Sequence, residues 1–330
     1  MANVLILGGT RNLGHATALA LLERNHTVTI MNRGQTKDDL PPTVERLRAD
    51  RNDSAAMRAA IGSRSWDLIL DNTTYTEADA TQAVELFTGR SQRYVFISSG
   101  QVYLVRENLA RPFRESDYAG PVMAEPPRES ADHPSWLYGA DKRNAEAVFD
   151  ASALSVTTLR LPMVASERDQ YGRIQGYIAR LLDGNPILVP DENGLPIRHI
   201  YVRDVADLIV NLIETSAGIN DRFNISWGES MTLGEFLDTL ALAAGVSKNV
   251  KRVPRAALEE KGLLPDCSPF SGKWMSELDN SKSLDAFRDA GITYTSPAGY
   301  LPLIVRDYID RWQSQGLVPE GYRQRNLETL

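Results

Sequence analysis

The sequence predicts an α/β fold, a doubly wound parallel sheet followed by a smaller mixed α/β lobe. Short apolar runs alternate with helical patterns through residue 161, and the first run, Val4-Leu5-Ile6-Leu7, ends at Gly8-Gly9. Parallel strands buried on both faces read as such continuous apolar runs, and each needs a crossover helix to reach its neighbour. A strand, a glycine-bearing turn and a helix in direct succession are typical of a Rossmann-type sheet.

The N-terminal half contains most of the expected sheet. Strands are predicted at residues 4–7, 27–31, 46–49, 66–70, 94–97 and 156–161, and helices up to about residue 24 and at residues 54–61, 77–87 and 138–149. Residues 100–135 instead contain prolines that interrupt regular structure. Long irregular segments in compact domains are usually functional or disordered, so this one is expected to border a substrate cleft.

The elements beyond Pro162 are less regular. Helices are expected at residues 172–182, 205–213, 232–244 and 300–312, and short strands at residues 187–189, 199–202 and 223–225. We predict a dinucleotide-binding domain at residues 1–162, with contributions from about residues 199–230, and a smaller substrate-binding lobe at residues 163–330.

The composition narrows the class of protein. A formal net charge of −7 argues against a nucleic-acid surface, which would show a basic stripe. The single cysteine, Cys267, excludes a disulfide within the chain, and the four histidines have no metal-ligand spacing, so no metal is expected. A core strand begins close to the N-terminus and no apolar run is long enough to span a bilayer, so we expect a cytoplasmic protein with no membrane partner.

The turn after the first strand is a candidate phosphate site. Gly8 permits a tight turn and Gly14 permits close packing of the helix on the strand. Backbone N–H groups and the positive end of the helix dipole meet there, where a pyrophosphate can bind without a basic side chain. The middle glycine of the three-glycine dinucleotide pattern is missing. The cofactor-binding candidates in this turn are Gly8, Thr10, Arg11, Asn12, Leu13 and Gly14.

The end of the second strand carries Asn32-Arg33-Gly34 and no carboxylate before Asp38. An acidic residue at this position binds the ribose 2′-hydroxyl in NAD sites and would repel a 2′-phosphate. Arg33 instead offers a bidentate partner for a phosphate, with Arg11 on the opposing turn. We therefore predict NADP(H) in preference to NAD(H). The alternatives are that NAD(H) is used, or that both arginines are solvated surface residues.

Polar residues also follow the later strands, at the edge where parallel sheets collect ligands. These further candidates are Asp50, Arg51, Asn72, Thr73, Ser98 and Ser99. Tyr138 and Lys142 are four residues apart on a predicted helix and therefore share a face. Because a nearby ammonium favours the phenolate, Lys142 is expected to lower the pKa of Tyr138, so that the phenol can act as an acid or base.

Together these features resemble the extended short-chain dehydrogenase/reductases, which include the NAD(P)-dependent epimerase/dehydratase group. The resemblance covers nearly the whole chain and rests on residues 8–14, 32–34, 50–51, 96–103, 138–142, 198–206 and 279–282. It implies that Tyr138 is the acid/base, that Lys142 holds the nicotinamide ribose and that Ser99 orients the reacting oxygen. It also implies that Asp50 and Arg51 lie against the adenine.

Two departures from the family pattern narrow the reaction. Members that eliminate water commonly carry a Glu after the catalytic hydroxyl residue, whereas this chain has Gly100-Gln101, so dehydration is disfavoured. Sugar-nucleotide enzymes of the family often carry an Asn three residues after the Arg of the sixth strand, whereas Arg160 is followed by Leu-Pro-Met. The remaining substrate-binding candidates are Ser99, Gln101, Tyr138, Arg173, Tyr177 and Arg198, of which Arg173 and Tyr177 share a helical face.

The predicted function is hydride transfer between NADP(H) and a secondary alcohol or ketone of a sugar, nucleotide sugar or related small metabolite, with Ser99, Tyr138 and Lys142 as catalytic residues. The main alternative within catalysis is an epimerase, which would oxidise and re-reduce its substrate without net cofactor consumption. The alternative of another class is a cofactor-binding scaffold that senses redox state or associates with RNA. The resemblance also implies a homodimer through the helices at residues 77–87 and 138–149.

Overall fold

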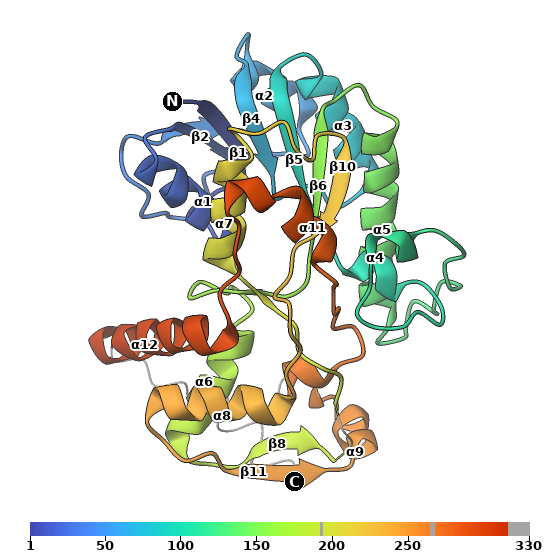
Figure 1. The fold of residues 1–330 in the computed structure, drawn as a ribbon, viewed down its shortest axis with the longest axis vertical. Coiled ribbons are helices and arrows are strands. Elements are labelled where there is room, and N and C mark those ends of the chain that lie inside the picture. The colour runs from blue at the N-terminus through green and yellow to red at the C-terminus, as the bar shows by residue number, and fades with distance from the viewer. Residues whose placement is uncertain (192–193, 265–267, 316–330) are drawn as a thin grey trace.

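A seven-stranded parallel sheet forms the upper half of the molecule, and the smaller lobe lies below it (Figure 1). The computed structural model describes residues 1–191, 194–264 and 268–315, so Cys267 lies outside the described part of the chain. The strands that build the sheet are β1 (Asn3–Leu7), β2 (Thr27–Asn32), β3 (Glu45–Arg48), β4 (Trp66–Asp71), β5 (Ser91–Ser99), β6 (Val156–Leu161) and β10 (Asp221–Asn224). The predicted α/β class is confirmed.

The strand order is β10-β6-β5-β4-β1-β2-β3, and all neighbouring pairs are parallel. The chain therefore builds the sheet outward from β1 on one side and then from β4 on the other. In open sheets of this kind, ligands bind where the order reverses, beyond the carboxyl ends of the strands. The switch point between β1 and β4 is thus the expected place for a site.

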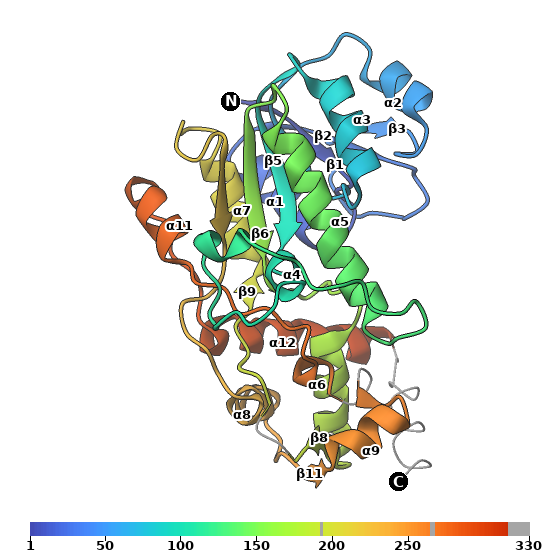
Figure 2. The ribbon, with the colours of Figure 1, turned by 90° about the vertical axis from the view of Figure 1, so that its right-hand side faces the viewer.

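Helices cover both faces of the sheet (Figure 2). The helices α1 (Asn12–Glu23) and α7 (Val202–Asn211) pack together on one face, and α2 (Ser54–Ile61), α3 (Glu77–Phe87) and α5 (His133–Asp150) lie on the other. Successive residues of β1 point into opposite cores: Val4 and Ile6 belong to the core beneath α1 and α7, and Leu5 and Leu7 to the core beneath α2, α3 and α5. This two-sided burial explains the continuous apolar runs.

The helix α5 begins at His133, earlier than the predicted start at Tyr138. Pro134 was expected to end regular structure, but it occupies the first turn of the helix, where a missing N–H costs nothing. The preceding irregular segment contains only the short helix α4 (Gln101–Leu104) and the 3₁₀ turn η1 (Glu115–Tyr118) as helical elements.

The smaller lobe is built from helices packed on short strands (Figure 1 and Figure 2). Its helix α8 (Leu233–Ala244) packs against α12 (Pro297–Gln315) and α6 (Arg173–Asp183). The strands β8 (Ile187–Pro190) and β11 (Val250–Val253) form one small parallel sheet, and β7 (Val164–Ala165) and β9 (Ile200–Tyr201) form another. The sequence did not predict β11, α9 (Arg255–Glu260) or α11 (Ser281–Ala286), which are too short for a clear periodic pattern.

Two classes of feature are absent from the described ranges. No helix there is long and apolar enough to cross a bilayer. Nor do three or more His, Cys, Asp or Glu side chains gather there into a group able to hold a metal ion.

Candidate active site

A cavity of about 940 Å³ lies at the carboxyl edge of the sheet and extends to the smaller lobe. Its walls come from the turns after β1 to β5, from α5, and from residues 161–164, 170–173 and 274–276. Every cofactor-binding candidate from the sequence lines it: Gly8, Thr10, Arg11, Asn12, Leu13, Gly14, Asn32, Arg33, Asp50, Arg51, Asn72, Thr73, Ser98, Tyr138 and Lys142.

The turn after β1 has the shape of a phosphate cradle. Gly8 has a φ of +102°, which L side chains rarely adopt, and its N–H donates to the carbonyl of Met31 at 2.8 Å. A Cβ on Gly14 would lie 2.8 Å from the backbone of Gly9, so a larger residue would separate α1 from the turn. Arg11 precedes α1 and makes no side-chain cap, which leaves N–H groups of the first turn for a ligand.

Unpaired polar atoms support a fit to a dinucleotide. The side-chain oxygen of Asn12 and both polar side-chain atoms of Asn72 are buried without a hydrogen-bond partner, and both residues line the cavity. Buried polar atoms are normally paired, so an orphaned set around a glycine turn indicates a site completed by a polar ligand. The residues present therefore fit a dinucleotide cofactor.

Arginines surround the end of β2. Arg33 has an exposed side chain and lies 4.0 Å from Asp50, and Arg11 donates to Thr36 at 3.1 Å. Asn32 accepts hydrogen bonds from the backbone of Gly34 and from Arg48, a cation that the sequence analysis did not single out. Two lining arginines, Arg11 and Arg33, and one lining carboxylate, Asp50, therefore share this end of the cavity.

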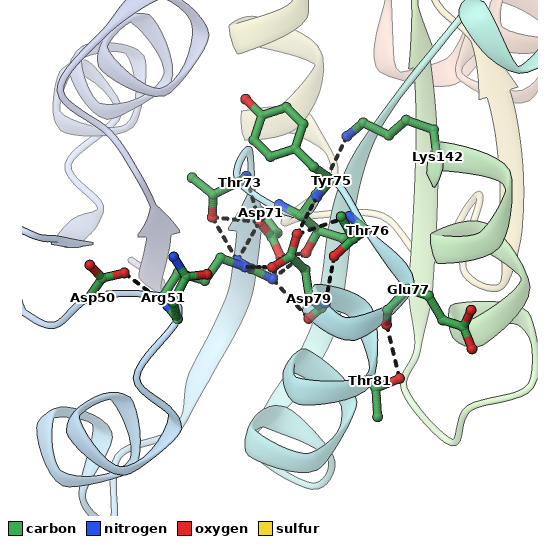
Figure 3. A network of polar contacts seen from close by, with 12 residues as sticks. Asp50, Arg51, Asp71, Thr73, Tyr75, Thr76, Glu77, Asp79, Thr81 and Lys142 are labelled. Atoms are coloured by element: carbon green, nitrogen blue, oxygen red, sulfur yellow. Dashed lines mark hydrogen bonds and ion pairs between the residues drawn. The ribbon is translucent and has the colours of Figure 1, made fainter. Parts of the chain in front are cut away.

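Arg51 and Asp71 form the centre of a buried polar network (Figure 3). The Arg51 guanidinium donates to both oxygens of Asp71 at 3.1 Å, and its Nε lies 3.5 Å from Asp79. Asp71 is fully buried at the end of β4, where it also accepts from Tyr94 and from the backbone N–H of Thr73 at 2.7 Å. Burial opposes ionisation of Asp71, but Arg51 and these hydrogen bonds outweigh it and lower the pKa of Asp71 to about 2.

This network fixes the turn that holds Lys142. Thr74 donates to Asp71 through its backbone N–H at 3.0 Å and through its hydroxyl at 2.5 Å. The carbonyl of Thr74 accepts a hydrogen bond from Lys142 Nζ at 2.6 Å, and the carbonyl of Ile97 accepts a second at 2.8 Å. Arg51 was expected to lie against the adenine; it lines the cavity, but its guanidinium is committed to this network.

Lys142, Tyr138 and Ser99 line the same part of the cavity. Lys142 is 2% exposed, and its Nζ lies 5.9 Å from the centre of the Tyr138 ring and 4.9 Å from that of Tyr75. Burial lowers the pKa of Lys142 to about 8. The hydrogen bonds to the carbonyls of Thr74 and Ile97 use two of its three N–H groups.

The expected lowering of the Tyr138 pKa is wrong for this structure. Burial raises the pKa of Tyr138 to about 12, and a hydrogen bond with Ser99 opposes this rise without overcoming it. The ammonium of Lys142 is directed at the carbonyls of Thr74 and Ile97, so its hydrogen bonds do not reach the phenol. The phenol is therefore protonated at neutral pH.

The substrate candidates separate into two groups. Ser99, Gln101, Tyr138 and Arg173 line the cavity, whereas Tyr177 and Arg198 do not. Tyr177 is buried in the lobe with its ring 5.4 Å from that of Phe270, and Arg198 donates to the carbonyl of Leu278 at 2.9 Å. Of the segment at residues 100–135, which was expected to border the cleft, only Gln101 is among the described lining residues.

Several lining residues were missed by the sequence analysis. Tyr75 follows the polar end of β4, and its position after Asn72-Thr73 could have marked it. Tyr171 and the stretch at residues 274–276 reach the cavity from the smaller lobe and carry no motif that would have identified them.

A parallel sheet with a glycine turn at its switch point defines the Rossmann class of α/β proteins. The chain belongs to the NAD dependent epimerase/dehydratase family, whose model matches residues 4–226.

Two relatives and one solved structure illustrate the range of similar proteins. Chloroplast stem-loop binding protein of 41 kDa b from Arabidopsis thaliana is 23% identical over 256 residues, which cover 73% of this chain and 63% of that protein. For 2′-dehydrokanamycin reductase from Streptomyces kanamyceticus, the identity is 24% over 219 residues, covering 64% of this chain and 57% of that protein. The chain thus spans less than two thirds of the length of these curated relatives. WbmG from Bordetella bronchiseptica, solved with NAD and UDP, has 18% identity and a TM-score of 0.70, covering 96% of each chain.

Proposed function

We propose that the protein catalyses hydride transfer between NADP(H) and a secondary alcohol or ketone of a sugar-like metabolite. The observation that carries this proposal is that Ser99, Tyr138 and Lys142 line the same cavity as the glycine turn. A proton donor beside a dinucleotide site is what such a reaction needs. The reductase among the relatives supports the same reaction class.

The protonated phenol favours the reductive direction. NADP(H), when bound, supplies or accepts the hydride. Ser99 and Tyr138 hydrogen-bond the carbonyl oxygen of the substrate, and the Tyr138 hydroxyl donates the proton that this oxygen needs when the carbonyl is reduced. Because burial raises the pKa of Tyr138 to about 12, this proton is present at neutral pH. Oxidation would first require its loss.

Dehydration remains disfavoured because the cavity offers no uncommitted carboxylate near Tyr138. Among the described residues that line it, the carboxylates are Asp50 and Asp79. Asp50 lies 4.0 Å from Arg33, at the far end of the cavity. Asp79 is held by Arg51 and accepts from the backbone N–H of Tyr75 at 2.9 Å. Elimination of water needs its own acid and base, which these groups do not supply.

The preference for NADP(H) rests on the cations around the end of β2. Arg33 and Arg11 line the cavity there, and the strand ends in Asn32 without a carboxylate to repel a 2′-phosphate. We expect fluorescence titrations to give a lower dissociation constant for NADPH than for NADH, which has a 2′-hydroxyl in place of the 2′-phosphate. Tighter binding of NADH would refute the preference.

Tyr138→Phe tests the catalytic proposal. We expect the rate of NADPH-dependent ketone reduction to fall by about 10²–10⁴, the usual contribution of general acid–base catalysis, with the dissociation constant of NADPH unchanged. Loss of NADPH absorbance with a panel of keto sugars measures this rate. The matched control is Tyr118→Phe, because the hydroxyl of Tyr118 lies outside the cavity and donates to the carbonyl of Arg143. Equal rates in Tyr138→Phe and the control would rule out the proposed role.

The family match favours an epimerase as the second candidate. An epimerase would use Ser99, Tyr138 and Lys142 for oxidation and re-reduction, and its cofactor would be retained through turnover. Isolation of the protein with a cofactor that does not exchange would favour it, whereas stoichiometric oxidation of added NADPH would exclude it.

The stem-loop binding protein among the relatives favours a third, non-catalytic candidate. A formal net charge of −7 counts against a nucleic-acid surface, since affinity for nucleic acids depends on phosphate neutralisation. Salt-dependent retention of an RNA hairpin by a protein that turns over no ketone would support the scaffold. Reduction that is lost in Tyr138→Phe would exclude it as the whole function.

A further inference from the structure

Positive charge is unevenly distributed along the cavity. Among the described lining residues, the cations are Arg11, Arg33, Arg51, Lys142 and Arg173. Arg11 and Arg33 follow β1 and β2, and Arg11 also donates to the side chain of Gln170 in the smaller lobe at 3.3 Å. Lys142 is buried and donates to two backbone carbonyls, and Arg51 is paired with Asp71. Among the described lining residues, Arg173 is the cation that the smaller lobe itself contributes.

Arg173 is itself neutralised. Its Nε and Nη2 donate to the two oxygens of Asp169 at 3.1 and 3.2 Å, and the Asp169 side chain is fully buried. Other cations near this end do not line the cavity: Arg111 donates to the carbonyls of Lys273 and Met275, and Lys273 pairs with Asp132 at 2.6 Å. The cation that the described part of the smaller lobe contributes to the cavity wall is therefore already paired with a carboxylate, which weakens its attraction for a diphosphate group.

Aromatic side chains line the substrate end of the cavity. Tyr75 and Tyr171 line this end while remaining 49% and 68% exposed, which is unusual for rings of this size. The Tyr75 ring centre lies 6.3 Å from that of Tyr138. Tyr171 lines the same cavity and, like Tyr75, is among the causes that raise the pKa of Tyr138.

The segment at residues 274–276 contributes a further ring, which a hydrogen bond orients. Trp274 lines the cavity, and its Nε1 donates to Asp132 at 2.9 Å. Neutral hydrogen-bonding groups accompany the rings: Gln101 has a buried amide oxygen without a partner, and Ser276 also lines the wall. Pockets with apolar rings and a few polar groups select ligands by shape and hydroxyl pattern.

We propose that the substrate is an uncharged glycoside or cyclic polyol without a phosphate, which places an apolar ring face against the aromatic side chains that line this end of the cavity, Tyr75, Tyr171 and Trp274. A nucleoside diphosphate sugar is excluded by this proposal. The inference rests on the proposed function, because it assumes that Tyr138 marks the reacting end of the cavity. Stacking on rigid rings supplies contact area at low entropic cost, and Gln101 then reads a hydroxyl.

The first test compares the two substrate classes directly. The full chain is supplied with NADP⁺ and, separately, with methyl glycosides and inositol or with UDP-glucose and UDP-galactose. Formation of NADPH reports oxidation, and chromatography of the products reports interconversion of the two UDP-sugars without net oxidation. We expect turnover of at least one uncharged compound, none of either UDP-sugar, and no inhibition by UDP at concentrations of about 1 mM, the weakest range of specific binding.

The outcomes separate this inference from the proposed function. Turnover of a UDP-sugar that is lost in Tyr138→Phe would overturn the inference and leave the function standing, as would inhibition by UDP that competes with an uncharged substrate. NADPH binding without turnover of any compound would overturn both.

The second test concerns the rings. Tyr171→Ala is expected to raise KM for the uncharged substrate about 3- to 10-fold with little change in kcat, the range for one aromatic contact, and Tyr171→Phe is expected to restore KM. Because Tyr171 is 68% exposed, its replacement does not open the core. Leu242→Ala on α8, 84% exposed and outside the cavity, is the control. An unchanged KM in Tyr171→Ala would remove the stacking surface from the proposal.

Discussion

Arg33 is the residue on which discrimination between the two nicotinamide cofactors depends in our proposal. Arg33→Ala removes an exposed cation at the end of β2 and leaves the glycine turn intact. A charge-assisted hydrogen bond contributes about 1.5–3 kcal/mol, so we expect the dissociation constant of NADPH to rise about 10- to 100-fold and that of NADH to change little. Arg306→Ala on the exposed face of α12 is the control. A parallel rise for both cofactors would assign Arg33 to the shared part of the dinucleotide.

The protonation state of Lys142 should make the rate of reduction fall at alkaline pH. Burial lowers the pKa of Lys142 to about 8, and the protonated amine is the form that has a third N–H for a ligand. We expect the rate of reduction to fall as pH rises through about 8. A pH–rate profile of the wild-type protein measures this limit, and a flat profile through this range would contradict it.

The same shift has a consequence for stability. The pKa of Lys142 is lower in the folded protein than the usual value of about 10.4, so between these values the folded state binds fewer protons than the unfolded chain. The contribution of this group to the free energy of unfolding therefore increases as pH rises from about 8 to about 10.4.

At the scale of elements, the turn after β4 depends on Asp71. This carboxylate is fully buried and bound to Arg51, Tyr94 and the following threonines. Asp71→Asn removes the fully buried partner of Arg51 and leaves Asp79 as the remaining acidic contact; breaking a buried ion pair typically costs about 3–5 kcal/mol of the free energy of unfolding. Urea unfolding measures the change, with Asp285→Asn in an exposed ion pair as the control. Equal losses in the two variants would show that the network is not what stabilises this turn.

The free energy of unfolding should also depend on the protonation of Asp71 at acidic pH. The pKa of Asp71 is about 2 in the folded protein, below its usual value of about 3.9. Its stabilising contribution is therefore complete above the usual value and is lost as pH falls through about 2. Asp71→Asn should lack this part of the acid dependence, and an unchanged dependence would contradict the assignment.

The elements themselves were largely predictable, but the direction of a helical face was not. Strands such as β4 and β5 are buried on both sides, so their apolar runs identify them without further context. In α6 the four-residue spacing of Arg173 and Tyr177 indicates a shared helical face. The spacing does not predict which part of the molecule this face contacts. In the structure Tyr177 is buried in the core of the smaller lobe. Packing against α8 decides this, and such packing involves residues far along the chain.

At the scale of the whole molecule, the cavity draws its walls from both the sheet and the smaller lobe. A ligand that binds only the folded state stabilises it, by about 2.7 kcal/mol when its concentration is 100 times its dissociation constant. We therefore expect saturating NADPH to raise the melting temperature, and Arg33→Ala to reduce this effect at equal concentration. NADPH binding that leaves the melting temperature unchanged would contradict a site built from the native fold.

The two sides of the cavity differ in how well the sequence predicts them. The carboxyl ends of parallel strands must meet at one edge, so the residues that follow them, such as Gly8, Asn72 and Ser99, come together once the sheet is predicted. Tyr171 and Trp274 join them from segments without periodic pattern. Their position depends on how the lobe packs against the sheet, which no local signal encodes.

The last strand of the sheet arrives late. The chain leaves β6 at Leu161, builds part of the smaller lobe, and only then returns with α7 and β10, which end at Asn224. The strands β1 to β6 are therefore synthesised well before β10, which pairs with β6, and before α7, which packs on α1. During that interval the nascent chain exposes an open strand edge and an uncovered apolar surface, both of which invite misassembly. We therefore expect chaperones to bind this translation intermediate until β10 has been synthesised.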